Sequence, residues 1–247
     1  MLGKYKLIIS DMDGTMVDHA QDAMPSSRVC EAITSYVNDG GLFAIATGRP
    51  YQLVKPVLEH LGVQAYCICD NGAVIVDSQT DEAIWEAALD STIIPEITTL
   101  LGTDTHLSIS PASNEKHIRK IGIFGISLEE ATELKEKLSA KIEKIVICFA
   151  TSHTPNAVDL YISAEGATKA HAAEELQRLL SVEASESIGI GDSFNDQPLL
   201  EVCGLGIAMG NAIPEIKARY SKAEVGADII NKFYVPLLSN CSRYDRI

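Results

Sequence analysis

Residues 6–15 read Lys-Leu-Ile-Ile-Ser-Asp-Met-Asp-Gly-Thr, an apolar run that ends in two carboxylates and a glycine. The run Leu7-Ile8-Ile9 has the length and the branched side chains of a buried β-strand, which places Asp11 and Asp13 at its carboxyl end. In an open α/β sheet, ligands bind outside that end of the strands. The stretch therefore predicts both a sheet and an acidic site at its edge.

Two neighbouring carboxylates repel each other unless a cation or a shared proton offsets their charge. Mg²⁺, a hard ion with oxygen ligands, is the usual cation, and one carboxylate can then act as a nucleophile while the other moves protons. The alternative is a plain turn at Gly14, or part of a calcium loop. A calcium loop needs further oxygen ligands at alternate positions, whereas Met16 and Val17 follow here.

Composition restricts the possible partners. The formal net charge of the 247-residue chain is −14, which argues against nucleic acid and anionic membranes, because both require a basic surface. No apolar run reaches membrane-spanning length and no signal-peptide pattern is present, so we expect a cytoplasmic protein. The six cysteines mostly lie in apolar runs, so we expect neither disulfides nor a zinc site at Cys67 and Cys69.

A second strand is expected at residues 42–46, after a helix that Ser26 or Ser27 caps and that runs to about Asn38. This strand-helix-strand order predicts a parallel crossover unit. The strand ends in Thr47-Gly48-Arg49-Pro50, so Thr47 emerges at the same sheet edge as Asp11. A hydroxyl and the free N–H groups of a helix start suit a phosphate, although ordinary turn chemistry also explains the motif.

A third strand is expected at residues 65–69, and Asp70-Asn71-Gly72 separates it from the apolar run 73–76. Asn-Gly between apolar runs is typical of a β-hairpin. We therefore favour a structural role for Asn71 and Gly72.

From about residue 82 to residue 163 the sequence becomes richer in Ser and Thr, and no strand there ends in carboxylates. Helices are expected at 91–101 and 128–139, with strands at 105–110, 120–124, 142–149 and 157–162. This pattern predicts a separate α+β unit inserted into the parallel sheet. Several polar residues of the unit could contact a substrate, but such residue types are commonly solvated: His106, Glu115, Lys116, His117, Arg119 and His153.

Lys169 is expected in the first turn of a helix that Thr168 caps and that runs to Leu180. A cation there opposes the helix dipole unless an anion lies beside it. An ammonium that faces Asp11 and a bound phosphate would be stabilised, although a surface lysine fits the spacing equally well.

A short strand at 187–190 ends in Gly191-Asp192-Ser193-Phe194-Asn195-Asp196, the second acidic cluster at a strand end. Asp192 or Ser193 could merely cap a helix over 195–202. With Asp11 and Asp13 as partners, one divalent ion would instead gather all four carboxylates. A strand at 204–209, a helix at 213–220 and a strand at 228–230 complete the expected elements.

The ordered set of motifs resembles the haloacid dehalogenase-like superfamily: Asp11-Met-Asp-Gly-Thr15, Thr47-Gly-Arg49, Lys169, and Gly191-Asp192 to Asp196. Residues 70–73 and 206–212 further resemble its Cof-like, type IIB branch. The chain departs from the usual Gly-x-x-Lys-Gly, which reads Gly166-Ala-Thr-Lys169-Ala, and it matches poorly after Ala223. The resemblance implies an α/β fold, a Rossmann-like parallel-sheet core with helices on both faces (1–82 and 164–247) and an inserted α+β cap domain (83–163).

The resemblance also implies a Mg²⁺-dependent phosphatase for a small phosphorylated metabolite, such as a sugar phosphate or a phosphoglycolate-like acid. Asp11 would be the nucleophile, Asp13 the proton carrier, and Lys169 a catalytic cation. The remaining roles would be phosphate binding by Thr47, Lys169 and the backbone N–H groups near Met12 and Gly48, and support by Arg49, Asn71 and Asn195. The metal would be held by Asp11, the backbone carbonyl of Asp13 and Asp192, with Asp196 as a ligand or next to the ligands. The alternatives are a phosphomutase and a phospho-acceptor regulator. The sequence does not predict the oligomeric state.

Overall fold

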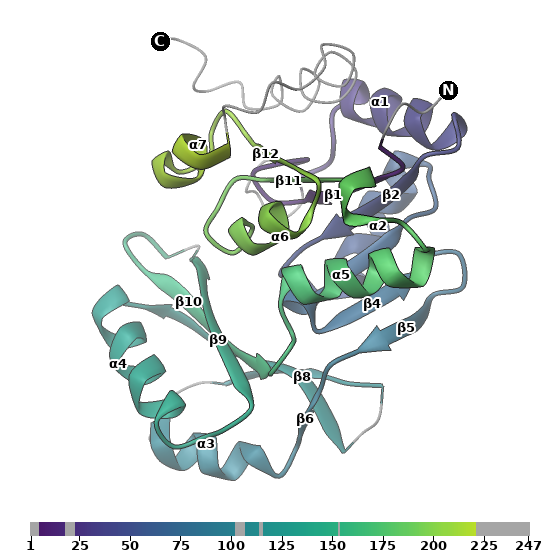
Figure 1. The fold of residues 1–247 in the computed structure, drawn as a ribbon. Coiled ribbons are helices and arrows are strands. Elements are labelled where there is room, and N and C mark those ends of the chain that lie inside the picture. Colours follow the sequence, from purple (N-terminus) through teal and green to yellow (C-terminus); the bar gives the residue numbers. More distant parts are fainter. Residues whose placement is uncertain (1–4, 18–22, 102–106, 114–115, 153, 221–247) are drawn as a thin grey trace.

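The computed structural model describes residues 5–17, 23–101, 107–113, 116–152 and 154–220, and in this part the chain forms two sheets (Figure 1). The larger sheet has seven strands, in the order β12 (Leu205–Ala208), β11 (Ser187–Gly191), β1 (Leu7–Asp11), β2 (Leu42–Ala46), β3 (Tyr66–Cys69), β4 (Val74–Asp77) and β5 (Glu82–Glu86). The strands from β12 to β3 are parallel, and β4 and β5 continue the sheet antiparallel.

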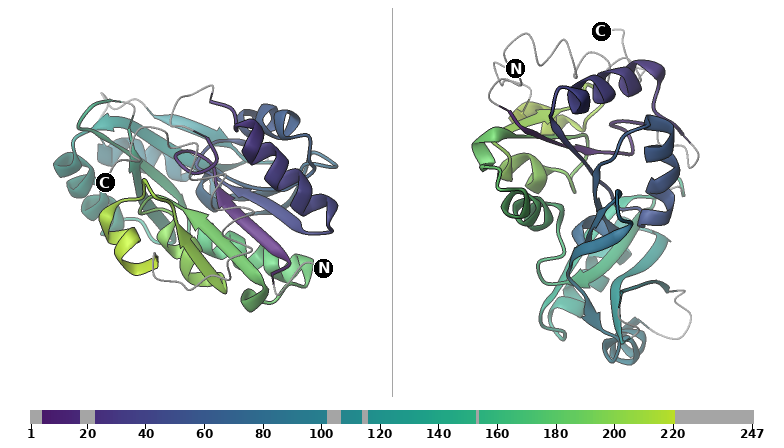
Figure 2. Two further views of the ribbon diagram at one scale, coloured as in Figure 1. Left: turned by 90° about the horizontal axis from the view of Figure 1, so that it is seen from above. Right: turned by 90° about the vertical axis from the view of Figure 1, so that its right-hand side faces the viewer.

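Helices cover both faces of this sheet, as predicted, and strand β1 is therefore buried on both sides. Ile8 belongs to the core on the side of α1 (Ser27–Asn38) and α2 (Tyr51–Leu61). Leu7 and Ile9 point the other way, toward α5 (Lys169–Leu180) and α6 (Gln197–Val202). Helix α7 (Pro214–Tyr220) lies beside β12, and Figure 2 shows the helical layers from two further sides.

The smaller sheet is antiparallel, in the order β6 (Leu89–Asp90), β8 (His117–Ile126), β10 (Val158–Ala164) and β9 (Ile145–Thr151), with β7 (Ser108–Pro111) also paired to β8. Helices α3 (Ile93–Leu101) and α4 (Leu128–Ser139) pack on one face of it around a separate apolar core. The polar residues His106, Glu115 and His153 lie outside the described residues, as does the strand expected at 228–230.

Strand pairing suggests where the boundary between the two units lies. The sequence placed it after residue 82, but residues 82–86 form β5, which pairs with β4 in the larger sheet. The next strand, β6, pairs with β8 in the smaller sheet. We therefore propose that the inserted unit begins between Glu86 and Leu89.

No described helix is long and apolar enough to cross a membrane. The five cysteines in the described part, at 30, 67, 69, 148 and 203, are all free thiols. Cys67 and Cys69 are buried in β3, as small hydrophobic side chains would be.

The expected hairpin follows β3, since β3 and β4 pair antiparallel across residues 70–72. Asn71 has φ 60° and Gly72 has φ 100°, so the turn requires backbone conformations that favour Asn and Gly. A Cβ atom at Gly72 would lie 2.2 Å from the carbonyl carbon and oxygen of Thr168. Gly72 thus lets the hairpin touch the start of α5.

This close approach predicts that Gly72→Ala lowers the free energy of unfolding by about 3 kcal/mol, the sum of left-handed strain and a backbone clash. Gly62→Ala is the matched control, because Gly62 also has positive φ, at 67°, but nothing lies within 4 Å of its added Cβ. It should lose only about 1 kcal/mol. Urea unfolding of both variants measures the difference, and equal losses would contradict the contact with Thr168.

Candidate active site

Three carboxylates from opposite ends of the chain meet at the carboxyl edge of the larger sheet. Asp11 ends β1, while Asp192 and Asp196 lie on the loop between β11 and α6. One oxygen of each lies within 4.8 Å of the others, and all three residues are buried. The structure thereby joins the two acidic clusters that the sequence expected to converge.

Lys169 lies between two of these carboxylates. Its Nζ is 2.6 Å from Asp11 Oδ1 and 2.6 Å from Asp196 Oδ1, and the residue is only 3% exposed. The position follows from α5, because Thr168 caps the helix by accepting from the His171 N–H and so fixes Lys169 in the first turn. Burial alone would lower the pKa of Lys169, but the charges of Asp11 and Asp196 outweigh burial and raise it.

The loop from Asp192 to Asp196 is closed by its own hydrogen bonds. Asp196 Oδ2 accepts from the Asp192 N–H (3.1 Å), the Ser193 N–H (3.0 Å) and the Ser193 hydroxyl (2.9 Å). The Ser193 hydroxyl also lies against Asn195 Oδ1, which can accept from it, so Asn195 supports the loop. A Cβ atom at Gly191 would lie 2.4 Å from Asp196 Cβ, so the strand must end in glycine for the loop to fold back.

The carboxylate cluster carries more negative charge than Lys169 can offset. Asp11 Oδ2 is buried and has no hydrogen-bond partner among the described residues. Burial raises the pKa of Asp11 well above its usual range, Asp196 raises it further, and Lys169 only partly opposes this. A hard divalent cation would satisfy the orphaned oxygen and offset the excess charge, so the donor set fits Mg²⁺.

Asp13 takes a different position from the one expected for its carboxylate. Arg49 holds it through two contacts, Nε to Oδ2 at 3.1 Å and Nη2 to Oδ1 at 2.5 Å, and the side chain is partly exposed. The gathered oxygens come from the other three aspartates and not from the Asp13 carboxylate. The reason is Arg49, whose planar guanidinium binds a carboxylate at two points.

The Thr47-Gly48-Arg49 loop lies beside the hairpin at Asp70 and Asn71. The Asn71 N–H donates to Thr47 O and the Asp70 N–H to Arg49 O, both at 3.0 Å, and Thr47 Oγ1 accepts from the Arg49 N–H at 3.1 Å. Thr47 is fully buried. The side chain of Met12 is buried in the core, so only its backbone could bind a phosphate.

Asn71 is more than a turn residue. Its side chain is 5% exposed, and neither Oδ1 nor Nδ2 has a hydrogen-bond partner among the described residues. A Cβ atom at Gly48 would lie 2.9 Å from Asn71 Oδ1, so the amide lies directly against the Gly48 backbone. Gly72, the next residue, touches Thr168 and Lys169, which places the unpaired amide between the two expected phosphate-binding segments.

Sequence reasoning missed Lys120, which comes from strand β8 of the inserted unit. Its Nζ lies 2.6 Å from Gly48 O and 2.9 Å from Asp70 Oδ1, and the residue is 6% exposed. A lysine between the buried residues Ile118 and Ile121 of one strand was the available signal. Arg119, considered instead, pairs with Glu86.

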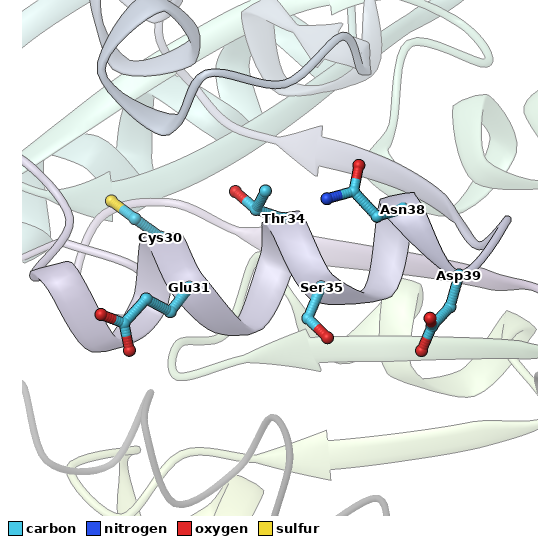
Figure 3. Close-up of a pocket in the computed structure, with 6 residues that line it drawn as sticks. All are labelled: Cys30, Glu31, Thr34, Ser35, Asn38 and Asp39. Carbon is cyan, nitrogen blue, oxygen red and sulfur yellow. The ribbon is translucent and has the colours of Figure 1, made fainter.

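A second missed residue is Asn211, whose Nδ2 donates to Gly14 O at 2.8 Å across the sheet edge. Thr15 also contributes, with its hydroxyl 3.5 Å from Asp192 Oδ1. Figure 3 shows a pocket along α1 and its C-cap that shares no residue with this site; its lining is Cys30, Glu31, Thr34, Ser35, Asn38 and Asp39.

The sequence profile of the haloacid dehalogenase-like hydrolases matches residues 8–119 and 103–224, which span the acidic cluster, Lys169 and the inserted unit. The chain belongs to this family. It is a hydrolase, and the membership expected from the ordered motifs is confirmed.

Known members resemble this haloacid dehalogenase-like hydrolase over most of their length. YxeH of Bacillus subtilis is 28% identical over 246 residues, 86% of this chain and 90% of YxeH. The HMP-PP phosphatase of Serratia proteamaculans is 27% identical over 90% of this chain and 89% of that protein. A haloacid dehalogenase-like hydrolase of B. subtilis shares the fold, with a TM-score of 0.74 at 21% identity over 87% of this chain and 93% of that one.

The excess negative charge of the site predicts that Mg²⁺ binds and stabilises the folded protein. At about 100 times its Kd, the ion should raise the free energy of unfolding by about 2.7 kcal/mol. Asp192→Asn should remove most of this increment, and Asp90→Asn, a distant exposed carboxylate that bonds Thr92, should retain it. Chemical unfolding with and without MgCl₂ measures both, and an undiminished increment in Asp192→Asn would contradict the assignment.

Proposed function

We propose that the chain is a Mg²⁺-dependent phosphatase that hydrolyses a small phosphorylated metabolite through an aspartyl-phosphate on Asp11. The observation that carries this proposal is the buried Lys169 bridge between Asp11 and Asp196, beside Asp192 and an unpaired Asp11 oxygen. A nucleophilic carboxylate next to a fixed cation is the arrangement that phosphoryl transfer requires. The relative from S. proteamaculans, named as a phosphatase, supports the same reaction class.

In the first step, a carboxylate oxygen of Asp11 attacks the phosphorus as the ester P–O bond breaks. Lys169 orients that carboxylate and offsets charge on the phosphoryl oxygens, with Thr47 and the backbone near Gly48 as further phosphate contacts. Asp11, Asp192, Asp196 and, as the resemblance implies, the backbone carbonyl of Asp13 would hold Mg²⁺, which supplies further positive charge to the phosphoryl group.

Asp13 moves the protons. It lies two residues after the nucleophile, at a partly exposed position where Arg49 holds it by two contacts. It gives a proton to the leaving oxygen, then takes one from the water that attacks the aspartyl-phosphate, and inorganic phosphate is released with Asp11 regenerated. Arg49 positions Asp13 in this scheme.

Two other functions use similar residues. A phosphomutase would return the phosphoryl group to its substrate, so it would isomerise a sugar phosphate without net release of phosphate. A phospho-acceptor regulator needs an Asp and a Lys, but no proton carrier at Asp13 and no inserted unit over the site. A cytoplasmic location stays a prediction.

Loss of the nucleophile should abolish turnover without unfolding the protein. Asp11→Asn keeps the size of the side chain and an oxygen for Lys169, but it should lower kcat for p-nitrophenyl phosphate by at least about a thousandfold. Phosphate release measures this, with circular dichroism as the test of folding. Hydrolysis at the wild-type rate would overturn the role of Asp11, and Asp90→Asn serves as the active control.

Loss of the proton carrier should trap the intermediate. The nitrophenolate of p-nitrophenyl phosphate leaves without a proton, so Asp13→Asn should still form the aspartyl-phosphate but hydrolyse it about a hundredfold more slowly. Acid quench and peptide mass spectrometry should then find a phosphoryl group on the Asp11 peptide in the variant. Rapid turnover with no labelled peptide would show that Asp13 is not the base of the second step.

A further inference from the structure

The face of the inserted sheet that is turned toward the active site carries aromatic side chains. Ile121 and Ile123 of β8 point into the apolar core beneath α3 and α4. The side chains of Lys120 and Phe124 alternate with them and lie on the opposite face. Because Lys120 contacts Gly48 O, this face begins at the expected phosphate-binding loop.

Two rings lie side by side on this face. Phe124 packs edge-on against Tyr161 of β10, with ring centroids 5.9 Å apart and an interplanar angle of 78°. Gly122 makes room for both, since a Cβ atom there would lie 3.0 Å from the ring of Phe124 and 3.3 Å from that of Tyr161. Lys120 completes the row, with its Nζ 4.8 Å from the Tyr161 ring centroid.

The side chains of Lys120, Tyr161 and Phe124 hold one another in place, but the rest of the protein does not cover them completely. Phe124 remains 53% exposed although its ring is fixed against Tyr161. Ser163, which pairs with Lys120 in the β8–β10 register, buries a hydroxyl that has no partner among the described residues. The exposed ring of Phe124 and the unpaired buried hydroxyl of Ser163 lie on the same face, and both indicate a ligand.

The charge of this face restricts the ligand. Lys120 is the only cation among residues 120–124 and 159–163, and it is already held by Asp70 and Gly48 O. Asp159, on the same strand as Tyr161, adds a carboxylate that accepts from the Gly125 N–H. Along residues 120–124 and 159–163, an anionic leaving group would therefore find only a lysine that already has two partners, whereas a flat uncharged ring would find two aromatic partners.

We propose that Lys120, Tyr161 and Phe124 form a leaving-group site, and that the substrate is a phosphate ester whose alcohol carries a planar aromatic ring. This inference rests on the proposed phosphatase activity and names its substrate class. The phosphate binds beside Lys169, and the ring extends along β8, past Tyr161 toward Phe124. Phe124 is then a residue that determines specificity.

The test compares two esters that differ only in their ring. Benzyl phosphate and cyclohexylmethyl phosphate both release a primary alcohol, but only the first carries an aromatic ring. The wild-type protein should prefer benzyl phosphate by about three- to tenfold in kcat/KM, as aromatic pairing predicts. Naphthylmethyl phosphate, which has a larger aromatic ring system, should be preferred over cyclohexylmethyl phosphate even more strongly than benzyl phosphate is.

Phe124→Leu keeps an apolar side chain but removes the ring, so the benzyl to cyclohexylmethyl ratio should fall toward one. Leu128→Ala is the matched control, because Leu128 is an equally exposed hydrophobic residue of the same unit on helix α4. It should leave the ratio unchanged. A wild-type ratio of one, or an equal ratio in Phe124→Leu and wild type, would overturn the aromatic site.

A binding measurement separates this inference from the proposed function. Benzylphosphonate and cyclohexylmethylphosphonate cannot be hydrolysed, and calorimetry on the Mg²⁺-loaded protein should give a lower Kd for the first by the same factor. If p-nitrophenyl phosphate is not hydrolysed at all, the phosphatase proposal fails whatever the ring preference. If it is hydrolysed and the two phosphonates bind equally, only the aromatic site is refuted.

Discussion

The bridge that Lys169 makes between Asp11 and Asp196 is the constraint on which the site depends. A buried ammonium is stable only when carboxylates surround it, and buried carboxylates need a cation in turn. The two carboxylates are 158 and 27 residues away from Lys169 in the sequence. The bridge therefore requires that β1, α5 and the loop after β11 have come together in the folded sheet. One ammonium cannot neutralise three carboxylates, and the proposed Mg²⁺ would offset the remaining negative charge.

Close backbone approaches make this bridge possible. The β3–β4 hairpin meets the start of α5 only because Gly72 lacks a side chain, and the Asp192 to Asp196 loop folds back only because β11 ends in Gly191. These contacts fix α5 and the loop relative to β1. The side chains that perform the chemistry are therefore set by backbone contacts of the scaffold.

The sequence predicted those parts of the site that depend on local pattern. Asp11, Thr47 and Asp192 follow short buried strands, and the carboxyl ends of parallel strands meet at one edge, so their convergence could be predicted without any long-range information. For Lys169, the unfavourable position in a first helical turn indicated a nearby anion, but a surface lysine fitted the spacing equally well, and only the family resemblance gave it a place in the site. The fold class followed from the alternation of strands and helices.

The remaining parts depend on contacts between elements whose relative position no periodicity encodes. The pairing of Arg49 with Asp13 is set by side-chain direction across two strands, and the sequence instead placed Asp13 with the other carboxylates. Strands β5 and β6 are short and lie on either side of the connection, so the sequence placed the change from one sheet to the other at about residue 82, a few residues before β6. Lys120 reaches Gly48 O and Asp70 only because the smaller sheet packs against loops of the larger one.

That docking also connects recognition with chemistry. Separating the inserted unit from the larger sheet would remove Lys120 from Gly48 O and leave the Asp70 carboxylate, 1% exposed, without its cation. Both contacts are made to the loops that carry Thr47 and the unpaired Asn71 amide. These loops therefore keep all of their contacts only when the two units are docked. A ligand that binds its phosphate at the larger sheet and its ring against Tyr161 and Phe124 would contact both units, and it would therefore favour the docked arrangement. Under the two proposals, binding of the leaving group would favour the same docked arrangement that brings Lys120 to Gly48 O.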